Sequence, residues 1–376
     1  MAVYKDKYST KDGRCWRYKS YFHNYNGELK VKNSRRYKTQ KEALQQERIF
    51  LLNRDKPVNK IFGDVANDYF NDLKVRVRES TYILYLSRYT HHIKPIFQDS
   101  YLNKITVLDI ERWKKSIISK VKNTDAANQY YAVFYEIFKY ANKKYEINYN
   151  PVVASGRFKI NSNKIITDKE KLKYITYEDF KTFLSVIDNE MWYAFFTTLY
   201  FTGLRKGEIL ALRWEDVDFN NKTLSINKSL TYHTNSGRYK ITPTKTSLNR
   251  TISMSNVLID VLQKYKDSQE KYGDFSKTWY VFGSGDALRE GEIYWIKDKY
   301  FKKANLFHKR ITIHQFRHSH VSLCVNEFLK SGEVDATKFF VIMSARMGHS
   351  IPVMQNIYMH LFPSAQDEIV DLLNNL

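Results

Sequence analysis

Four apolar runs with helical spacing follow one another between about Lys60 and Gly156, and they leave few choices for how this part of the chain folds. Each run places an apolar side chain every three or four residues, which gives each helix one buried stripe. The last run extends from Ala127 to Tyr145 and is followed by Asn150-Pro151, a helix stop. The pattern predicts a bundle of four or five helices. The apolar positions of the first three runs are Phe62, Val65, Ala66, Tyr69, Phe70 and Leu73, then Tyr82, Leu84, Tyr85, Tyr89 and Ile93, then Ile105, Leu108, Ile110 and Trp113.

The region before this bundle, from Met1 to about Asp55, has short strand-like runs instead. Asp12-Gly13 and Asn26-Gly27 are dipeptides that commonly close β-hairpins. A helix is expected to open at Thr39, where Glu42 completes a capping box. The first region is therefore predicted to be a three-stranded sheet with one helix.

Positive charge distinguishes the whole chain. Its 61 Lys and Arg residues against 40 Asp and Glu give a formal net charge of +21, which favours a polyanionic partner such as nucleic acid. In the first region aromatic and basic residues interleave, which is typical of a sheet that enters a DNA groove, although a half-buried sheet with a solvated charged face gives the same alternation. Each basic residue on the helical bundle is likewise either a phosphate contact or a solvated surface charge. The candidate DNA contacts are Arg14, Arg17, Lys19, Arg35 and Arg36 in the first region and Arg76 and Arg78 in the second.

Several other classes of protein are disfavoured. Cys15 and Cys324 are the two cysteines and lie far apart in the sequence, so neither a disulfide framework nor a cysteine metal site is indicated. The first residues lack the apolar core of a signal peptide, and the apolar stretch from Met191 to Phe201 is too short to span a bilayer. We therefore expect a cytoplasmic protein without membrane association.

A polar segment between Arg157 and Lys173 lacks periodicity and is interpreted as a linker. Beyond it, Thr176 is placed to cap a helix, with Asp179 at the third helical position. The chain is thus predicted to be a multidomain protein, mainly α with small β elements. The domains are expected at residues 1–56, 60–156 and 174–376, with the linker at 157–173, and the last is a mixed α+β domain.

This third domain carries several basic residues in settings that suit phosphoryl chemistry. Breaking and rejoining DNA without external energy requires a nucleophile that keeps the phosphate in a covalent ester, fixed cations for the charged transition state and an acid for the leaving oxygen. The sequence shows no carboxylate cluster that would hold metal ions for this purpose. It offers Arg205 beside a glycine turn with Glu208 to orient it, Lys245 between strand-like runs at 222–226 and 250–253, His314 and Arg317 on a helix that opens after Thr312, Gly348-His349, and Tyr358.

This ordered set resembles the catalytic set of the tyrosine recombinases, the phage lambda-type integrase family, over about Thr176 to Leu361. Met347, where leucine is usual, and Gln355, where threonine is common, are small departures. The resemblance implies that Tyr358 attacks a phosphodiester and leaves a 3′-phosphotyrosine and a free 5′-hydroxyl, without ATP, metal or other cofactor. It also implies that Arg205 and Arg317 hold the non-bridging oxygens, that Lys245 is the general acid, and that His314 and His349 assist.

The same resemblance implies the remaining organisation. Residues 1–56 would be an arm-type DNA-binding domain, 60–156 a core-binding domain and 174–376 the catalytic domain of an integrase for a prophage or genomic island. The expected partners are double-stranded DNA with core and arm attachment sites, three further copies in a tetramer on DNA, a host DNA-bending protein and an excisionase. The apolar stripe Ile369, Val370, Leu372 and Leu373 would dock either on a neighbouring copy or on its own chain.

Four other interpretations compete with this one, and the first of them, a basic structural protein, would leave the ordered set of site residues unexplained. A type IB topoisomerase also nicks DNA through a tyrosine, but the three-part layout argues against it. A DNA-binding repressor would not need Tyr358. The run His314, Arg317, His318 and His320 could suggest a metal site, but Arg317 would repel a cation.

Overall fold

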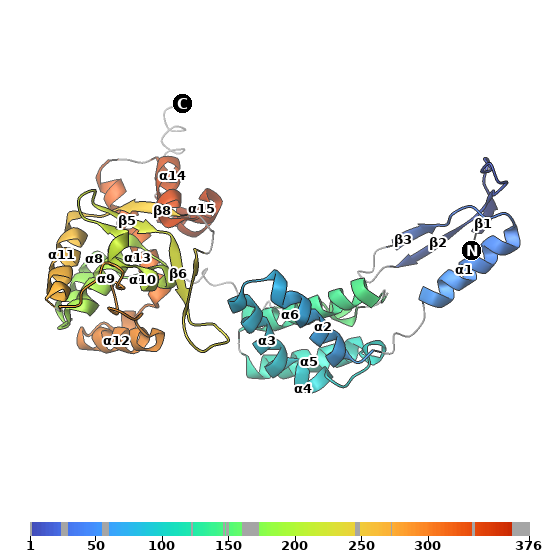
Figure 1. Cartoon of the computed structure of the whole chain (residues 1–376), viewed down its shortest axis with the longest axis horizontal. Coiled ribbons are helices and arrows are strands. Elements are labelled where there is room, and N and C mark those ends of the chain that lie inside the picture. Colours follow the sequence, from blue (N-terminus) through green and yellow to red (C-terminus); the bar gives the residue numbers. More distant parts are fainter. Residues whose placement is uncertain are drawn as a thin grey trace, which may run out of the picture. The chain divides into compact units, whose positions relative to one another are not determined.

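The computed structural model describes residues 2–23, 29–54, 60–121, 123–145, 147, 150–159, 173–244, 249–271, 273–332 and 335–362. The chain divides into two compact units, Met1–Thr167 and Asp168–Leu376 (Figure 1). The division falls within the polar segment 157–173, of which residues 160–172 lie outside the described residues. Across the described ranges, no helix is both long and apolar enough to cross a membrane.

The first unit begins with the predicted sheet and helix. The strands β1 (Ala2–Lys5), β2 (Trp16–His23) and β3 (Leu29–Asn33) pair antiparallel in the order β1-β2-β3. The turn before β2 contains Asp12-Gly13 as predicted, with Gly13 at a positive φ of 79° and its N–H donating to Thr10 O. Asn26-Gly27 lies outside the described residues.

The helix of this sheet, α1 (Gln40–Arg54), starts where the sequence predicts, but its capping differs in one bond. Thr39 Oγ1 accepts from the N–H of Glu42 at 3.1 Å. The Glu42 carboxylate accepts from the N–H of Lys38 rather than from that of Thr39, so the predicted reciprocal box is wrong in that half. Ala43 of this helix packs with Tyr18 and Tyr37 in a small core.

The rest of the first unit is helical, as the four apolar runs predict. Phe62 and Phe134 lie at the centre of its core, with ring centroids 5.3 Å apart. Asn150-Pro151 does more than end a region, because Asn150 caps a further short helix with Pro151 in its first turn. The helices are α2 (Phe62–Arg76), α3 (Glu79–His92), α4 (Lys94–Phe97), α5 (Val107–Lys120), α6 (Thr124–Tyr145) and α7 (Pro151–Ser155).

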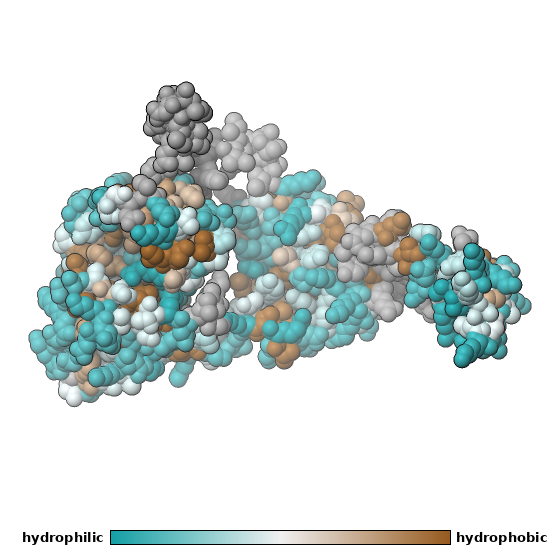
Figure 2. All heavy atoms as spheres, turned by 90° about the horizontal axis from the view of Figure 1, so that it is seen from above, coloured by the Kyte–Doolittle hydropathy of each residue, from teal (hydrophilic) through white to brown (hydrophobic). Residues whose placement is uncertain are grey.

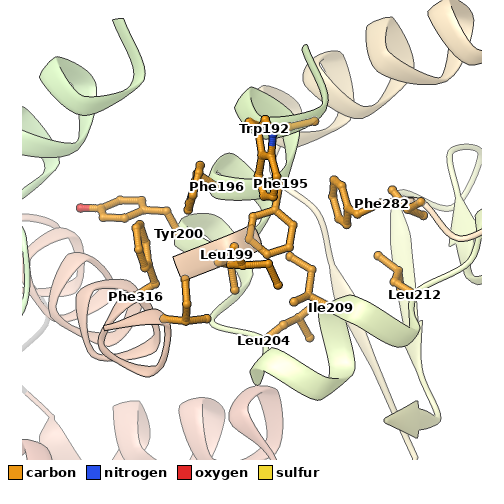
Figure 3. Close-up of a cluster of buried hydrophobic side chains, with 14 of the residues drawn as sticks. Trp192, Phe195, Phe196, Leu199, Tyr200, Leu204, Ile209, Leu212, Phe282 and Phe316 are labelled. Atoms are coloured by element: carbon orange, nitrogen blue, oxygen red, sulfur yellow. The ribbon is translucent and has the colours of Figure 1, made fainter. Parts of the chain in front are cut away.

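The second unit is built around α9 (Glu190–Thr202), which is buried on nearly every side. Figure 3 shows its side chains meeting those of Ile209 and of Phe282 and Phe316, which come from distant parts of the sequence. The apolar stretch 191–201 is thus the central core helix of this unit. Around it are α8 (Tyr177–Ser185), α10 (Lys206–Ala211), α11 (Asn256–Glu270), α12 (Glu290–Lys303), α13 (Ile313–Lys330), α14 (Ala336–Met347) and α15 (Ile351–Tyr358).

Two predicted helix starts in this unit are confirmed. Thr176 Oγ1 accepts from the N–H of Asp179, and Thr312 with Gln315 forms a complete capping box at α13. Such caps satisfy N–H groups that have no partner inside the helix.

Two small sheets complete the second unit. The predicted strand-like runs pair with each other, since Ser225 of β5 faces Thr251 of β8 in an antiparallel register. The first sheet has the order β4-β5-β8, from β4 (Val217–Asp218), β5 (Thr223–Ile226) and β8 (Arg250–Ser253), and the second pairs β6 (Lys228–Thr231) with β7 (Lys240–Pro243). The predicted fold class, mainly helical with small sheets in several domains, is confirmed.

Polar side chains cover most of the surface that Figure 2 shows, with smaller apolar patches between them. The large apolar side chains of each unit gather in separate buried clusters. Most of the charge surplus of the chain is therefore left at the surface, and the buried charges of the second unit are exceptions that need partners.

Candidate active site

Arg205 lies where α9 ends and α10 begins, at the glycine turn that the sequence indicates. Gly203 ends α9 with a φ of 63°, and a Cβ atom there would come within 2.8 Å of Met347 and 2.9 Å of His320. Both the backbone conformation and the close approach require glycine. The turn thereby directs the guanidinium of Arg205 to Gly348, whose carbonyl oxygen accepts from Nη2 at 2.9 Å.

Glu208 orients Arg205, as predicted, and also holds a second arginine. Its carboxylate accepts from Arg205 Nη1 at 2.9 Å and from both terminal nitrogens of Arg250 at 3.0 and 2.8 Å. Burial would raise the pKa of Glu208, but the hydrogen bonds and charges of Arg250 and Arg205 outweigh it and lower this pKa to about 2. One buried carboxylate, which is ionised at neutral pH, thus fixes two cations.

Arg317 projects from α13 and is almost completely buried, with 1% of its surface exposed. Nη1 donates to the carbonyl oxygen of Gly203 at 2.7 Å, and Nη2 donates to that of Met347. Burial and the neighbouring Arg205 lower the pKa of Arg317 to about 9, which leaves it cationic at neutral pH.

His349 follows the turn that both arginines hold. Gly348 has a φ of 62° and ends α14, and the N–H of His349 donates to Ser344 O. Burial, and after it Arg317 and Arg205, lower the pKa of His349 to about 4, so its imidazole is neutral at neutral pH. Within the described part of the chain, His349 Nδ1 and Arg317 Nε are buried without a hydrogen-bond partner. Buried polar atoms are rarely left so, and these two belong to residues close enough for Arg317 to lower the pKa of His349, which indicates a place for a polar ligand.

Tyr358 is the last residue of α15 and is 1% exposed. Its ring packs in an apolar cluster with Val321, Met347 and Met354. Burial raises the pKa of its phenol to about 12, although Arg317 acts in the opposite direction. Tyr358, the predicted nucleophile, therefore lies close enough to Arg317, a predicted phosphate-binding residue, for the charge of Arg317 to affect its pKa.

Of the two other predicted catalytic residues, one can be placed. His314 is exposed on the first turn of α13, with its ring centroid 5.2 Å from that of His318. Lys245 lies outside the described residues. The structure therefore brings together Arg205, Arg317, His349 and Tyr358, with His314 at the edge of the group.

Sequence reasoning left several residues of this site without a role. Arg250 holds Glu208, and its Nε also donates to Arg346 O at 2.8 Å. Arg346 in turn donates to His320 Nε2 and to the carbonyl oxygens of Ser253 and Phe201. Partners so distant in sequence carry no local signal.

The histidines of α13 do not converge on a common point, as metal ligands would. His318 Nδ1 bonds to the hydroxyl of Tyr358, whereas His320 Nδ1 bonds to Tyr200 O and its Nε2 to Arg346. Across the described residues there is no group of three or more His, Cys, Asp or Glu side chains that could hold a metal ion. Cys324 is half-buried in α13, with its Sγ atom 3.7 Å from His320 Nε2.

The candidate DNA contacts of the first unit lie in a different setting. Arg17 and Arg36 both pair with Asp6, at 3.3 and 2.8 Å, and Arg14 pairs with Asp12 at 2.7 Å. The remaining candidates contact rings or the main chain, namely Lys19 over Tyr21, Arg35 over Tyr37, and Arg76 Nε donating to Asp72 O, while Arg78 occupies the N-cap position of α3.

The arrangement in the second unit is suited to one kind of substrate. Arg205 and Arg250 share the Glu208 carboxylate and Arg317 lies near it, so these four groups carry a surplus of two positive charges before anything binds. A phosphodiester supplies one negative charge, and a second develops as a nucleophile adds to phosphorus. A protonated tyrosine and a neutral histidine beside these cations are the groups that such an addition uses.

Comparisons with known proteins agree with this chemistry. The chain matches the model of the phage integrase family over residues 173–364 and that of the N-terminal SAM-like domain of phage integrases over residues 61–118. It is 30% identical over 294 residues to the ICEBs1 integrase of Bacillus subtilis, covering 76% of this chain and 75% of that protein. It is also 25% identical over 384 residues to a XerC-like tyrosine recombinase of Caldanaerobacter subterraneus, covering 90% of each.

Among solved structures, the Tn1549 transposon integrase in complex with a circular intermediate DNA has the same fold. The TM-score is 0.64 at 20% sequence identity, over 83% of this chain and 99% of that chain. The family match extends over more than half of the sequence and includes every predicted catalytic residue. The chain therefore belongs to the phage integrase family, the tyrosine recombinases, which cut and rejoin DNA.

Proposed function

We propose that this protein is the integrase of a mobile element, either a prophage or a genomic island, and that it integrates and excises that element through a covalent bond between Tyr358 and DNA. The observation that carries the proposal is the buried cationic site of the second unit. There Arg205 and Arg317 meet the Gly348 turn, and His349 and Tyr358 lie beside them.

Each residue has one task in this proposal. Arg205 and Arg317 bind the non-bridging oxygens of the scissile phosphate, and Glu208 keeps Arg205 in place. The Tyr358 oxygen attacks phosphorus, a 3′-phosphotyrosine forms, and Lys245 protonates the departing 5′-oxygen. His349 and His314 donate hydrogen bonds to the phosphate, for which the unpartnered Nδ1 of His349 is suited.

The two other parts of the chain bind DNA in the same proposal. Residues 60–156, which include the match to the SAM-like domain, contact the core site, and residues 1–56 contact a separate arm site. Four copies act on two duplexes, and a host DNA-bending protein and an excisionase set the direction. The relatives that support a mobile element are the ICEBs1 integrase and the Tn1549 transposon integrase.

The test is covalent trapping on a duplex from the junction of the element, nicked so that the leaving strand diffuses away. The wild type is expected to give a slow-migrating protein–DNA species on a denaturing gel, and Tyr358→Phe is expected to give none. Tyr200→Phe is the matched control, because Tyr200 is also 1% exposed and this substitution removes the same hydroxyl group at a position outside the site. Tight binding of the duplex without an adduct in the wild type would refute catalysis and favour a DNA-binding repressor. Relaxation of supercoiled DNA without strand exchange would favour a topoisomerase.

A further inference from the structure

The hydroxyl of Tyr358 has a specific partner that the predicted catalytic set does not contain. His318 Nδ1 lies 2.7 Å from it, within hydrogen-bond distance, and the two ring centroids are 5.7 Å apart. His318 projects from α13 one residue after Arg317, whereas Tyr358 ends α15, so the contact joins the element that holds the phosphate-binding arginine to the element that carries the nucleophile.

The surroundings of this contact determine the protonation states of His318 and Tyr358. Burial, and then His314 and Arg317, lower the pKa of His318 to about 4, so the imidazole is neutral at neutral pH. Burial raises the pKa of Tyr358 to about 12, so the phenol is protonated. A neutral imidazole has one ring nitrogen free to accept, and in the tautomer that is protonated at Nε2 the O–H of Tyr358 donates to His318 Nδ1.

The rest of the phenol is surrounded by apolar side chains. Val321, Phe340, Met343 and Met354 belong to the cluster that encloses it. A buried hydroxyl without a hydrogen-bond partner is unfavourable, so the bond to His318 favours one orientation of the ring. In that orientation the oxygen lies beside Arg317 rather than among the apolar groups.

We propose that His318 orients the hydroxyl of Tyr358 and takes up its proton as the phenol attacks DNA. The proposal rests on the proposed function. In the step, a bond forms between the tyrosine oxygen and phosphorus while the bond from phosphorus to the 5′-oxygen breaks. The phenolic proton moves to Nδ1 of His318, and a separate acid, Lys245, protonates the 5′-oxygen. Resealing reverses both transfers.

A bound phosphodiester favours this transfer. Its negative charge would lie next to Arg317 and would offset the cations that disfavour protonated His318. Proton transfer by a positioned side chain typically contributes about 10²–10⁴-fold to a rate.

The experiment measures single-turnover cleavage of the nicked duplex by the full chain carrying His318→Leu or His318→Asn. Leucine removes the acceptor, and the rate is expected to fall by about 100-fold or more while DNA affinity stays within a factor of two. Asparagine can accept a hydrogen bond near the position of Nδ1 but cannot take a proton at neutral pH, so its rate should lie between those of leucine and wild type. His308→Leu, at an exposed histidine of the same unit, is the matched control and should cleave at the wild-type rate.

A second substrate separates the two proton transfers. A duplex with sulfur in place of the 5′-bridging oxygen has a leaving group that needs no acid, because a thiol has a pKa near 8.5. This substrate should restore cleavage by Lys245→Ala but not by His318→Leu. If the leucine variant does not fold, His318→Asn replaces it in this comparison, with the same expectation.

Three results would overturn the inference and leave the recombinase intact. The first is a cleavage rate of folded His318→Leu within about threefold of the wild-type rate. The second is a cleavage rate of His318→Asn equal to that of the wild type. The third is restored cleavage by a His318 variant on the duplex with the 5′-bridging sulfur. Failure of the wild type itself to form the adduct would overturn the proposed function together with this inference.

Discussion

Arginines of both units form ion pairs with carboxylates, but in the first unit the carboxylate lies at the surface and in the second it is buried. On the N-terminal sheet, Arg17 and Arg36 share Asp6 at the surface, and about a third of each arginine side chain remains exposed. In the second unit, Arg205 and Arg250 share Glu208, whose side chain is 1% exposed. Both groups have two cations on one acid, so the chemistry is the same and burial is the difference.

That difference determines what each group can do. In water an ion pair gains little, and its partners can separate when a phosphate arrives. In a buried group each charge depends on the others, because removing one leaves the rest without compensation. The surface group is suited to binding DNA reversibly, whereas the buried group is suited to holding a transition state in one geometry.

The largest expected effect is that of Glu208→Ala. Two largely buried guanidinium groups, 17% and 9% exposed, would lose their shared partner, and breaking such a buried pair typically costs about 3–5 kcal/mol in the free energy of unfolding. Urea denaturation of the full chain measures this loss. Asp6→Ala is the matched surface change and should leave the midpoint nearly unchanged. Equal losses in the two variants would mean that burial is not what separates the groups.

Arg317→Lys is expected to reduce cleavage while preserving charge. A lysine cannot donate to Gly203 O and Met347 O in the planar geometry of a guanidinium. Loss of one positioned donor typically lowers a rate by about 10²–10³-fold. Single-turnover adduct formation measures the effect, and Arg36→Lys in the first unit should cleave normally. A fully active Arg317→Lys would show that charge alone suffices.

A fall in pH should lower the free energy of unfolding of the second unit more than that of the first unit. His320 is fully buried, and burial with Arg346 lowers its pKa to about 3, against 6.5 for an ordinary histidine. The neutral form is therefore retained on folding, and the stability that it contributes is present above pH 6.5 and is lost as the pH falls towards 3. Between pH 7 and 5 this one residue should lower the free energy of unfolding by about 2 kcal/mol.

Protonation of His318 and His349 should also lower the free energy of unfolding of this unit as the pH falls, since the pKa values of both are lowered to about 4. Within the described residues of the first unit, a lowered histidine pKa is found at His92, which is less buried. Hydrogen exchange resolved by peptide and corrected for the intrinsic effect of pH would follow both units in the full chain. Equal loss of protection in the two units would contradict the prediction.

The smallest effect is expected for Arg17→Ala on the N-terminal sheet. If the residue leaves Asp6 to contact a phosphate, the variant should bind arm-site DNA slightly less tightly. The slope of log affinity against log salt should then decrease by about 1. Titrations at several salt concentrations measure it. An unchanged slope would favour the alternative in which the charged face of this sheet is merely solvated.

The sequence was sufficient where local rules determine the structure. Thr176 and Thr312 cap helices because a hydroxyl can reach an N–H three residues on, whatever the rest of the chain does. The runs around residues 223–226 and 250–253 alternate as strands do, and they pair. Arg205 and Glu208 lie one helical turn apart, so their contact could also be predicted.

Contacts between distant residues could not be predicted in this way. Arg250 reaches Glu208, and His318 reaches Tyr358, only because α10, β8, α13 and α15 pack together. The same limit applied to the first unit, where the fold rather than the local pattern brings Asp6 between Arg17 and Arg36. A basic residue in the sequence indicates a charge, but its surroundings decide whether that charge is available to DNA.

The carboxylate that Arg205 and Arg250 share has a consequence for how this protein can evolve. Surface cations such as Arg14 and Arg36 can be exchanged one at a time, and under the proposed function each exchange offers selection a variant for a new attachment site. Arg205, Glu208 and Arg250 are inherited as one unit, because a lineage that changes one of them passes through a less stable ancestor until a second change follows. New DNA targets should therefore arise at the surface of this enzyme, while these three residues of its buried site change together or stay as they are.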